Sequence, residues 1–248
     1  MKKVRIIKVG GNIIDNPQAL EAFLGEFAQV EGMKILVHGG GKIATAVAKG
    51  LGIEAQMIDG RRVTDAPMLR VVTMVYAGLI NKEVVVKLRG EGCNAIGLTG
   101  ADGGLIQSKK RSATPIDFGY VGDPTEVNLE TATTLLEGGL VPIIAPLTLG
   151  DAELLNTNAD TVAQTIATGL AAKYEVTLEF RFEKAGVLLD INDPSSLVKE
   201  ITAQKFEELK QCGAVAQGMI PKITNALQAV EQGVESVYIG GTLVCATK

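Results

Sequence analysis

Two short apolar segments near the N-terminus each run directly into glycines and then into a helix-forming sequence. Residues 4–9 are rich in β-branched side chains and precede Gly10-Gly11, and residues 34–37 lie just before Gly39–Gly41. A short buried strand, a tight glycine turn and a helix form the repeating unit of a parallel α/β sheet. Glycine N–H groups and a helix N-terminus after such a strand can converge on an anion. The tandem units therefore predict an anion site, and the alternative is that the glycines only form tight turns.

The rest of the chain continues to alternate between helix and strand patterns. Helices are predicted over residues 17–30, 42–51, 66–89, 129–137, 156–172, 202–211 and 221–231, and further strands over residues 94–98, 140–145, 174–182 and 236–239. Hairpins at 53–63 and 146–155 are expected to add antiparallel strands. This alternation predicts an α/β fold with a mainly parallel sheet, and the symmetry of content suggests a boundary near residue 155.

The charge and the cysteine pattern exclude several classes of function. The net charge is −4 and the chain has no basic tail, which gives nucleic-acid binding little electrostatic support. No apolar run reaches the roughly 20 residues of a membrane helix, and the N-terminus does not resemble a signal peptide. Cys93, Cys212 and Cys245 form no C-x-x-C pair, which is typical of a reducing compartment. We therefore expect a cytoplasmic protein that binds neither nucleic acid nor membrane.

The chain contains a single histidine, so no site can be built from several of them. His38 comes just before the glycine triplet, and we interpret it as a packed residue at the end of a strand. If the protein uses a general base, that base must be His38, a carboxylate, a lysine or a tyrosine.

Three charged positions do not follow local rules. Lys8 lies within an otherwise apolar strand, where a buried lysine needs a partner, unless it lies at a sheet edge with its ammonium group in water. Lys222 lies in the first turn of a predicted helix, where a cation opposes the helix dipole, at little cost if it is exposed. Residues 156–160 contain Asn156, Asn158 and Asp160, although one residue is enough to cap a helix. Departures of this kind mark candidate functional residues.

Two weaker motifs leave alternatives open. Arg61-Arg62 follows the turn signal Asp59-Gly60, and such a pair is either solvated surface or a fork that binds a carboxylate. Gly39–Gly41 with Ala44 fits the loose dinucleotide pattern G-x-G-x-x-A, which keeps a dinucleotide-dependent oxidoreductase as an alternative. A nucleotide-sensing module without catalysis is a further alternative.

Taken in order along the chain, these motifs resemble the amino-acid kinase family. The matching segments are Lys8–Gly11, 37–41, 60–64, 77–82, 97–103, 121–122, Asn156–Asp160 and 218–222. The resemblance implies a three-layer αβα sandwich with a mainly parallel central sheet. It implies a substrate lobe over residues 1–155 and an ATP-binding lobe over residues 156–248. It also implies phosphorylation of the γ-carboxylate of N-acetyl-L-glutamate in arginine biosynthesis, with N-succinyl-L-glutamate as the alternative substrate.

The resemblance also implies roles for individual residues. Lys8 and Lys222 resemble the lysines that stabilise the transferring phosphoryl group, and Asp160 resembles the carboxylate that orients them. The expected backbone donors are Gly11, Gly40 and Gly41, and the expected substrate anchors are Arg62 and Asn156. Nucleotide contacts are expected from Lys8, Gly10, Glu183, Gly186, Leu188, Ala214, Val215, Ala216 and Lys222. ATP would carry Mg²⁺ on its phosphates, with no metal site in the protein.

Such a reaction suits a chain with one histidine, because a carboxylate nucleophile is already ionised at neutral pH and needs no general base. The difficulty is repulsion between two anions, which fixed positive charges and N–H donors relieve.

Two features depart from the family pattern. The family usually has a Ser/Thr-Asp-Val-x-Gly turn at the nucleotide, whereas residues 178–186 read LEFRFEKAG and place Glu183 at the position of the aspartate. Alternation puts Glu179, Arg181 and Glu183 on the face opposite Phe180 and its apolar neighbours. In addition, the sequence begins at its first strand, without the extra helix of arginine-inhibited members. We therefore expect a homodimer without arginine feedback.

Overall fold

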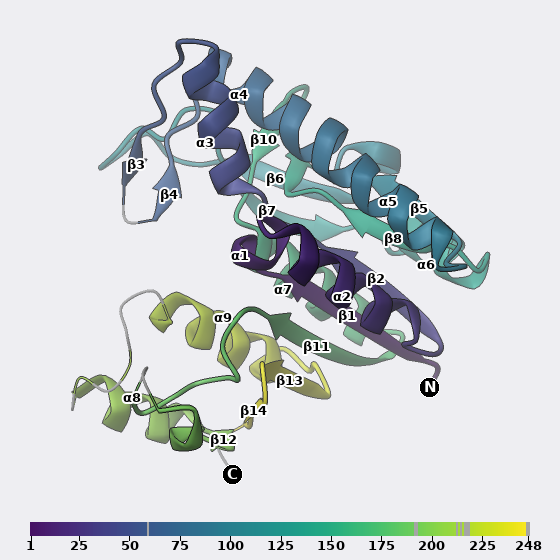
Figure 1. Ribbon diagram of the computed structural model, residues 1–248, viewed down its shortest axis with the longest axis vertical. Helices are drawn as coiled ribbons and strands as arrows, with labels where there is room; N and C mark the ends of the chain where they lie inside the picture. Colours follow the sequence, from purple (N-terminus) through teal and green to yellow (C-terminus); the bar gives the residue numbers. More distant parts are fainter. Residues whose placement is uncertain (59, 191–192, 212, 214, 216–218, 247–248) are drawn as a thin grey trace.

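The centre of the molecule is an eight-stranded sheet. The computed structural model describes residues 1–58, 60–190, 193–211, 213, 215 and 219–246 (Figure 1). The strand order is β12-β14-β13-β11-β1-β2-β8-β5. The bounds are β1 Lys3–Val9, β2 Met33–Val37, β5 Ala95–Leu98, β8 Val141–Ile144, β11 Glu175–Arg181, β12 Glu200–Ile201, β13 Ser236–Ile239 and β14 Thr242–Val244. From β13 to β5 every neighbouring pair is parallel, and β14 is antiparallel to β13.

Helices cover both faces of this sheet (Figure 1). One set comprises α1 Gly11–Ile14, α2 Pro17–Ala28, α3 Gly41–Gly50, α4 Ala66–Val72, η1 Thr73–Ile80 and α5 Asn81–Gly90. The other comprises α6 Leu129–Glu137, α7 Ala159–Ala171, α8 Ala203–Gln211 and α9 Ile220–Glu231. Strand β1 alternates between the two cores, because Ile7 and Val9 pack with the first set whereas Val4 and Ile6 pack with the second. The αβα sandwich expected from the sequence is confirmed.

A second, smaller sheet is separate from the large one, although its residues Ile106 and Leu147 belong to the two cores of the sandwich. It has the order β10-β9-β6-β7, with β6 Ile106–Lys110, β7 Gly122–Val127, β9 Leu147–Leu149 and β10 Leu154–Asn156. The β9–β10 pair and the short hairpin of β3 Met57–Ile58 with β4 Arg61–Arg62 confirm the two predicted hairpins. Strands β6 and β7 were not predicted, because their sequences IQSKK and GDPTEV lack a clear apolar alternation. Strand β6 also makes a buried polar contact with β9, in which Ser108 Oγ donates to Thr148 Oγ1 at 2.8 Å.

The helix predicted over residues 66–89 is continuous but not uniform. Its middle portion, η1, is a π-helix between α4 and α5. This portion carries Tyr76 and Ile80 against Gly40, whose φ is 145°. A Cβ atom on Gly40 would overlap the Cδ1 atom of Ile80. The close approach and the backbone conformation both require glycine at this position.

The two halves of the chain share the central sheet. Strands β1 and β2 come from the N-terminal half, and β11 and β13 come from the C-terminal half. The predicted boundary at 155 falls within β10, shortly before α7, and the division into lobes stays a prediction. Two shorter elements are η2 Asp102–Gly104 and η3 Pro194–Ser196. Within the described residues, no helix is both long and apolar enough to cross a membrane.

Candidate active site

The two lysines that departed from local rules contact the same carboxylate. Lys8 Nζ lies 2.8 Å from Asp160 Oδ1, and Lys222 Nζ lies 2.6 Å from Asp160 Oδ2. Lys8 comes from the end of β1, Asp160 from the first turn of α7 and Lys222 from the first turn of α9. The three side chains are between 10% and 17% exposed. Two ammonium groups around one carboxylate leave a net positive charge, so this cluster can attract an anion.

Burial and charge act in opposite directions on this cluster. Burial lowers the pKa of Lys8, and the attraction of Asp160 offsets only part of that effect. Burial alone would raise the pKa of Asp160, but the charges of Lys8 and Lys222 outweigh it and hold that pKa at about 2. Asp160 therefore stays ionised at neutral pH and holds both ammonium groups in place.

The polar residues at the start of α7 have different roles. Asn158 caps the helix, because its Oδ1 accepts hydrogen bonds from the N–H groups of Asp160 at 2.9 Å and Thr161 at 3.1 Å. Asn156 instead donates to Thr64 Oγ1 at 3.0 Å and is 8% exposed. Since Asn158 alone makes the cap, the side chain of Asp160 is available for the lysines.

Both glycine turns open into helices. Gly11 is the first residue of α1, and Gly41 is the first residue of α3. The N–H groups in a first helical turn have no carbonyl partner within the helix, so they can donate to a ligand. Gly10 differs, since its N–H donates to the Arg181 carbonyl at 2.7 Å. Any contact of Gly10 with a nucleotide must therefore use other atoms.

A lysine also connects the two turns. Lys42 Nζ donates to Asn12 Oδ1 at 2.6 Å, and Lys42 and Asn12 lie in the first turns of α3 and α1. The contact links the two helix starts at the surface, where the side chain of Lys42 is 73% exposed.

The single histidine is a packed residue, as interpreted from the sequence. His38 is fully buried, and its Nε2 accepts from Asn81 Nδ2 at 3.1 Å. The proton is therefore on Nδ1, which donates to the Gly39 carbonyl at 2.9 Å. Burial lowers the pKa of His38 to about 4. The ring is neutral near pH 7 and holds the start of the glycine triplet in place.

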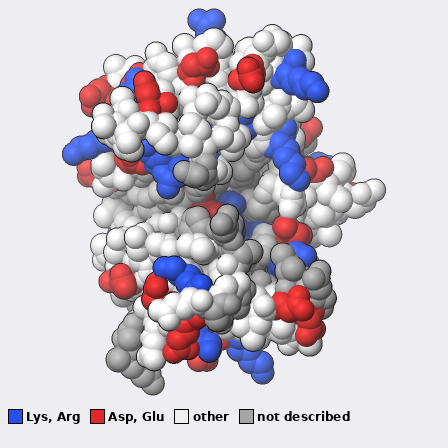
Figure 2. All heavy atoms as spheres, turned by 90° about the vertical axis from the view of Figure 1, so that its left-hand side faces the viewer, with Lys and Arg blue, Asp and Glu red and all other residues white. Residues whose placement is uncertain are grey.

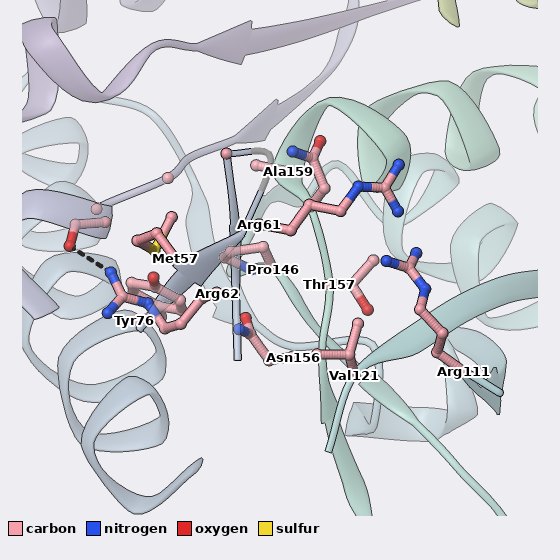
Figure 3. Close-up of a pocket in the computed structure, with 15 residues that line it drawn as sticks. Met57, Arg61, Arg62, Tyr76, Arg111, Val121, Pro146, Asn156, Thr157 and Ala159 are labelled. Carbon is pink, nitrogen blue, oxygen red and sulfur yellow. Dashed lines mark hydrogen bonds between the residues drawn. The ribbon is translucent and has the colours of Figure 1, made fainter. Parts of the chain in front are cut away.

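The predicted substrate residues surround one cavity, which Figure 3 shows between the β3–β4 hairpin and the start of α7. Its lining residues are Gly39, Gly40, Gly41, Met57, Gly60, Arg61, Arg62, Tyr76, Arg111, Val121, Pro146, Asn156, Thr157, Asn158 and Ala159. Arg62 is buried and donates through Nη2 to the Gly41 carbonyl at 2.8 Å and to Thr45 Oγ1 at 2.9 Å. Figure 2 shows one face of the molecule hollowed across its middle, with charged atoms in the depth of the hollow.

The end of β11 and the residues that follow it have the predicted alternation. Glu179 is 9% exposed and bridges Arg5 at 3.3 Å and Arg181 at 2.9 Å. On the other face, Lys222 Nζ lies 5.9 Å from the ring centroids of both Phe180 and Phe182. The aromatic residues of this unusual segment therefore flank one of the two lysines.

The residues expected to bind the nucleotide do not all face one surface. Glu183 is exposed, and its charge raises the pKa of Lys8, against the larger effect of burial. Gly186 is buried against Gly240, Leu188 pairs with Leu197, and Val215 lies in the apolar core. Ala214 and Ala216 lie outside the described residues, as does Gly218 of the predicted motif. The nucleotide contacts stay a prediction.

Arg111, Tyr76 and Thr157 line the cavity although the sequence did not single them out. Arg111 ends the basic run 109–111, which reads as solvated surface, and Tyr76 lies inside a long helix. The guanidinium groups of Arg61 and Arg111 both project toward the side of the cavity that carries Thr157 (Figure 3). No pattern in the sequence predicts that Arg111 lies near Arg61.

Comparison with known proteins places the chain in a family. Residues 3–241 match the model of the amino acid kinase family. A protein named acetylglutamate kinase from Cytophaga hutchinsonii is 54% identical over 241 residues, which cover 96% of this chain and 91% of that protein. An acetylglutamate kinase from Bacteroides thetaiotaomicron is 48% identical over 248 residues, which cover 100% and 96%. The crystal structure of smu.665 from Streptococcus mutans aligns with a TM-score of 0.79 and 27% identity, covering 100% of this chain and 98% of that one. The chain belongs to the amino acid kinase family.

Proposed function

We propose that this protein transfers the γ-phosphoryl group of ATP to the γ-carboxylate of N-acetyl-L-glutamate, as a step of arginine biosynthesis. The observation that carries the proposal is Asp160 held between Lys8 and Lys222, at 2.8 Å and 2.6 Å. The names of the relatives at 54% and 48% identity support the same reaction. N-succinyl-L-glutamate is the alternative substrate of the same chemistry.

The reaction needs no proton transfer. An oxygen of the γ-carboxylate attacks the γ-phosphorus, a new P–O bond forms, and the bond to the bridging oxygen of ADP breaks. Negative charge shifts onto that bridging oxygen and spreads over the transferring group. Lys8 and Lys222 stabilise this charge, while Asp160 keeps their ammonium groups in position. A neutral, buried His38 fits a mechanism without a general base.

The cavity supplies the acceptor site in this proposal. Gly11 and Gly41 offer N–H donors at the starts of α1 and α3. Arg62 and Asn156 line this cavity and would anchor the α-carboxylate of the acylated amino acid. The acceptor would lie with its γ-carboxylate toward the lysine cluster.

ATP would lie against the C-terminal half, with its phosphates at Lys8 and Lys222. The positive charge of this cluster and the nearby helix starts fit a polyphosphate. Magnesium carried on the phosphates would neutralise part of their charge during transfer. The adenine contacts proposed for Glu183–Leu188 and 214–216 belong to the same model.

Trapping of the product tests the proposal directly. Acyl phosphates react with hydroxylamine to form coloured hydroxamates, so the protein is incubated with MgATP, hydroxylamine and N-acetyl-L-glutamate. Hydroxamate that requires both ATP and the substrate is expected, with one ADP for each hydroxamate. N-acetyl-L-glutamine, whose γ-carboxylate is replaced by an amide, should give no product. Absence of ATP-dependent product with both N-acetyl- and N-succinyl-L-glutamate would reject the proposal.

The same experiment separates the rival functions. A nucleotide-sensing module would bind ATP without turnover. The oxidoreductase alternative rests on Gly39–Gly41 and Ala44, and membership of the amino acid kinase family argues against it. Cytoplasmic location is part of the proposal, and Cys93 and Cys245 are free thiols in the structure.

A further inference from the structure

The cavity contains more positive charge than N-acetyl-L-glutamate requires. That substrate has two carboxylates. In the proposed function, the γ-carboxylate faces Lys8 and Lys222, and Arg62 takes the α-carboxylate. Arg61 and Arg111 also line the cavity, and an acetyl methyl group offers neither of them a partner.

The cavity also continues beyond the space described so far. A second hollow shares Arg61, Arg111, Thr157 and Asn158 with it. The remaining residues of that hollow are mostly polar, namely Gly122, Asp123, Thr161, Gln164, Thr224, Asn225 and Gln228. A short apolar acyl group would bind better against an apolar wall, because a specificity pocket matches the chemistry of its ligand. The polar extension therefore suits a longer acyl group that ends in a polar function.

Arg111 is held in place by Asp123, which lines the second hollow, and by Phe118. Its Nε donates to both carboxylate oxygens of Asp123 at 3.2 Å, and its Nη2 donates to Oδ1 of the same residue. The guanidinium carbon lies 5.5 Å from the centroid of the Phe118 ring. The side chain is 19% exposed, against 52% for that of Asp123. A guanidinium group has five N–H donors, so Arg111 can bind Asp123 and still donate to a ligand.

Arg61 is the more available of the two arginines. It lies on β4, and within the described part of the chain no hydrogen bond or ion pair engages its side chain. Figure 3 shows its guanidinium group and that of Arg111 on the same side of the cavity, near Thr157. With Asp123 included, the local charge is that of two guanidinium groups and one carboxylate. One further carboxylate would neutralise it.

We propose that Arg61 and Arg111 form an anion subsite for a carboxylate at the far end of the acyl group. The substrate class would then be L-glutamate that carries a dicarboxylic acyl group, of which N-succinyl-L-glutamate is the probe. The inference rests on the proposed function and refines its substrate.

The first test compares three acceptors with the wild-type protein. N-succinyl-, N-butyryl- and N-acetyl-L-glutamate are assayed for ATP-dependent hydroxamate, and kcat/KM is measured for each. N-butyryl has the same number of acyl carbons as N-succinyl but ends in a methyl group. We expect kcat/KM for N-succinyl to exceed both others by about 10- to 100-fold, the usual effect of charge-assisted hydrogen bonds. Equal or higher kcat/KM with N-acetyl or N-butyryl would overturn the inference and leave the proposed function standing.

The second test uses substitutions. Arg61→Gln and Arg111→Gln should lower kcat/KM for N-succinyl by about 10- to 100-fold and change that for N-acetyl by less than about threefold. Asp123→Asn removes the competing carboxylate and should raise the preference for N-succinyl. Arg70→Gln loses the same charge from the exposed surface of α4 and serves as the matched control. A uniform loss with all acceptors, or a raised KM for ATP, would contradict the subsite.

A binding measurement separates this inference from the proposed function. Calorimetric titration of N-succinyl-L-glutamate needs no turnover, so it reports on the subsite even if no acceptor is phosphorylated. Binding that weakens about tenfold or more in Arg61→Gln supports the subsite. Unchanged binding in both Arg61→Gln and Arg111→Gln would show that the two arginines do not form this subsite.

Discussion

At the scale of single residues, the charges of the lysine cluster depend on one another. Lys8 is buried at the end of an apolar strand, and its ammonium group stays there because Asp160 lies 2.8 Å away. Asp160 in turn stays ionised because two cations surround it. Loss of one lysine therefore removes charge from the site without leaving the carboxylate unpaired.

Replacement of either lysine by methionine tests its role. Lys8→Met and Lys222→Met keep most of the apolar stem and remove the charge. We expect kcat to fall by about 100-fold or more, because each ammonium group stabilises charge that develops during transfer. Lys49→Met, on the exposed face of α3, is the control and should retain wild-type kcat. Steady-state kinetics measure kcat, and thermal melts check that each variant is folded. Full activity in both site variants would show that the catalytic assignment is wrong.

The buried histidine makes stability depend on pH. The pKa of His38 falls from 6.5 to about 4 on folding, so the unfolded chain binds a proton that the folded chain does not. Stability contributed by this residue is present above pH 6.5 and is lost as the pH falls toward 4. The full loss is about 3 kcal/mol.

Urea unfolding at pH 7.5, 6 and 5 measures this dependence. The decline between pH 7.5 and 5 should be clear in the wild-type protein and much weaker in His38→Gln. Because the chain has one histidine, no other histidine contributes to that window. Parallel pH profiles for the two proteins would contradict the assigned pKa.

At the scale of elements, local patterns predicted most helices and strands within a few residues. They did so because strand, glycine turn and helix follow one another within short segments, as at residues 33–50. The short helix α1 after the first glycine turn was not among the predicted helices. They missed β6 and β7, whose polar strands are stabilised by partners from distant segments, such as Thr148 against Ser108. They also missed the π-helical middle of the long helix, since its register depends on packing against Gly40.

The contact between η1 and the glycine triplet gives a prediction at this scale. Gly40→Ala places a methyl group into Ile80 at a φ of 145°, and we expect it to lower the free energy of unfolding by about 2–3 kcal/mol. Gly39→Ala is the matched control, because no atom lies within 4 Å of its added Cβ. Urea denaturation compares the two, and equal losses would show that η1 does not constrain the triplet.

At the scale of the whole molecule, we propose that the protein is a homodimer. Among the described residues, β5 pairs only with β8 and ends the large sheet, which leaves one edge available. Leu79 and Val86 are 48% and 69% exposed on the helices η1 and α5, and α5 packs on β5. An exposed apolar helix face beside a sheet edge is a surface that a second copy can cover.

Light scattering tests the dimer. The wild-type mass should be twice the 26.0 kDa of the chain, and Val86→Glu should shift it toward the monomer. Met74→Glu, 54% exposed on the same helical run near the end of α3, is the control and should remain a dimer. A wild-type monomer or hexamer would contradict the proposal, and inhibition by arginine would contradict the expected absence of feedback.

The sequence by itself determined most of the alternation of strands, glycine turns and helices, and it singled out Lys8, Lys222 and Asp160. It did so because each signal is local, a periodicity, a cap or a charge in the wrong place. Only the tertiary structure decided that these three residues meet, since Asp160 and Lys222 lie 62 positions apart and Lys8 reaches them through strand order. The same holds for Arg111. In the sequence it is part of a basic run, and only the fold shows that it lines the cavity with Arg61. Distances between residues far apart in the chain depend on the order in which the strands pair, and no local sequence pattern specifies that order.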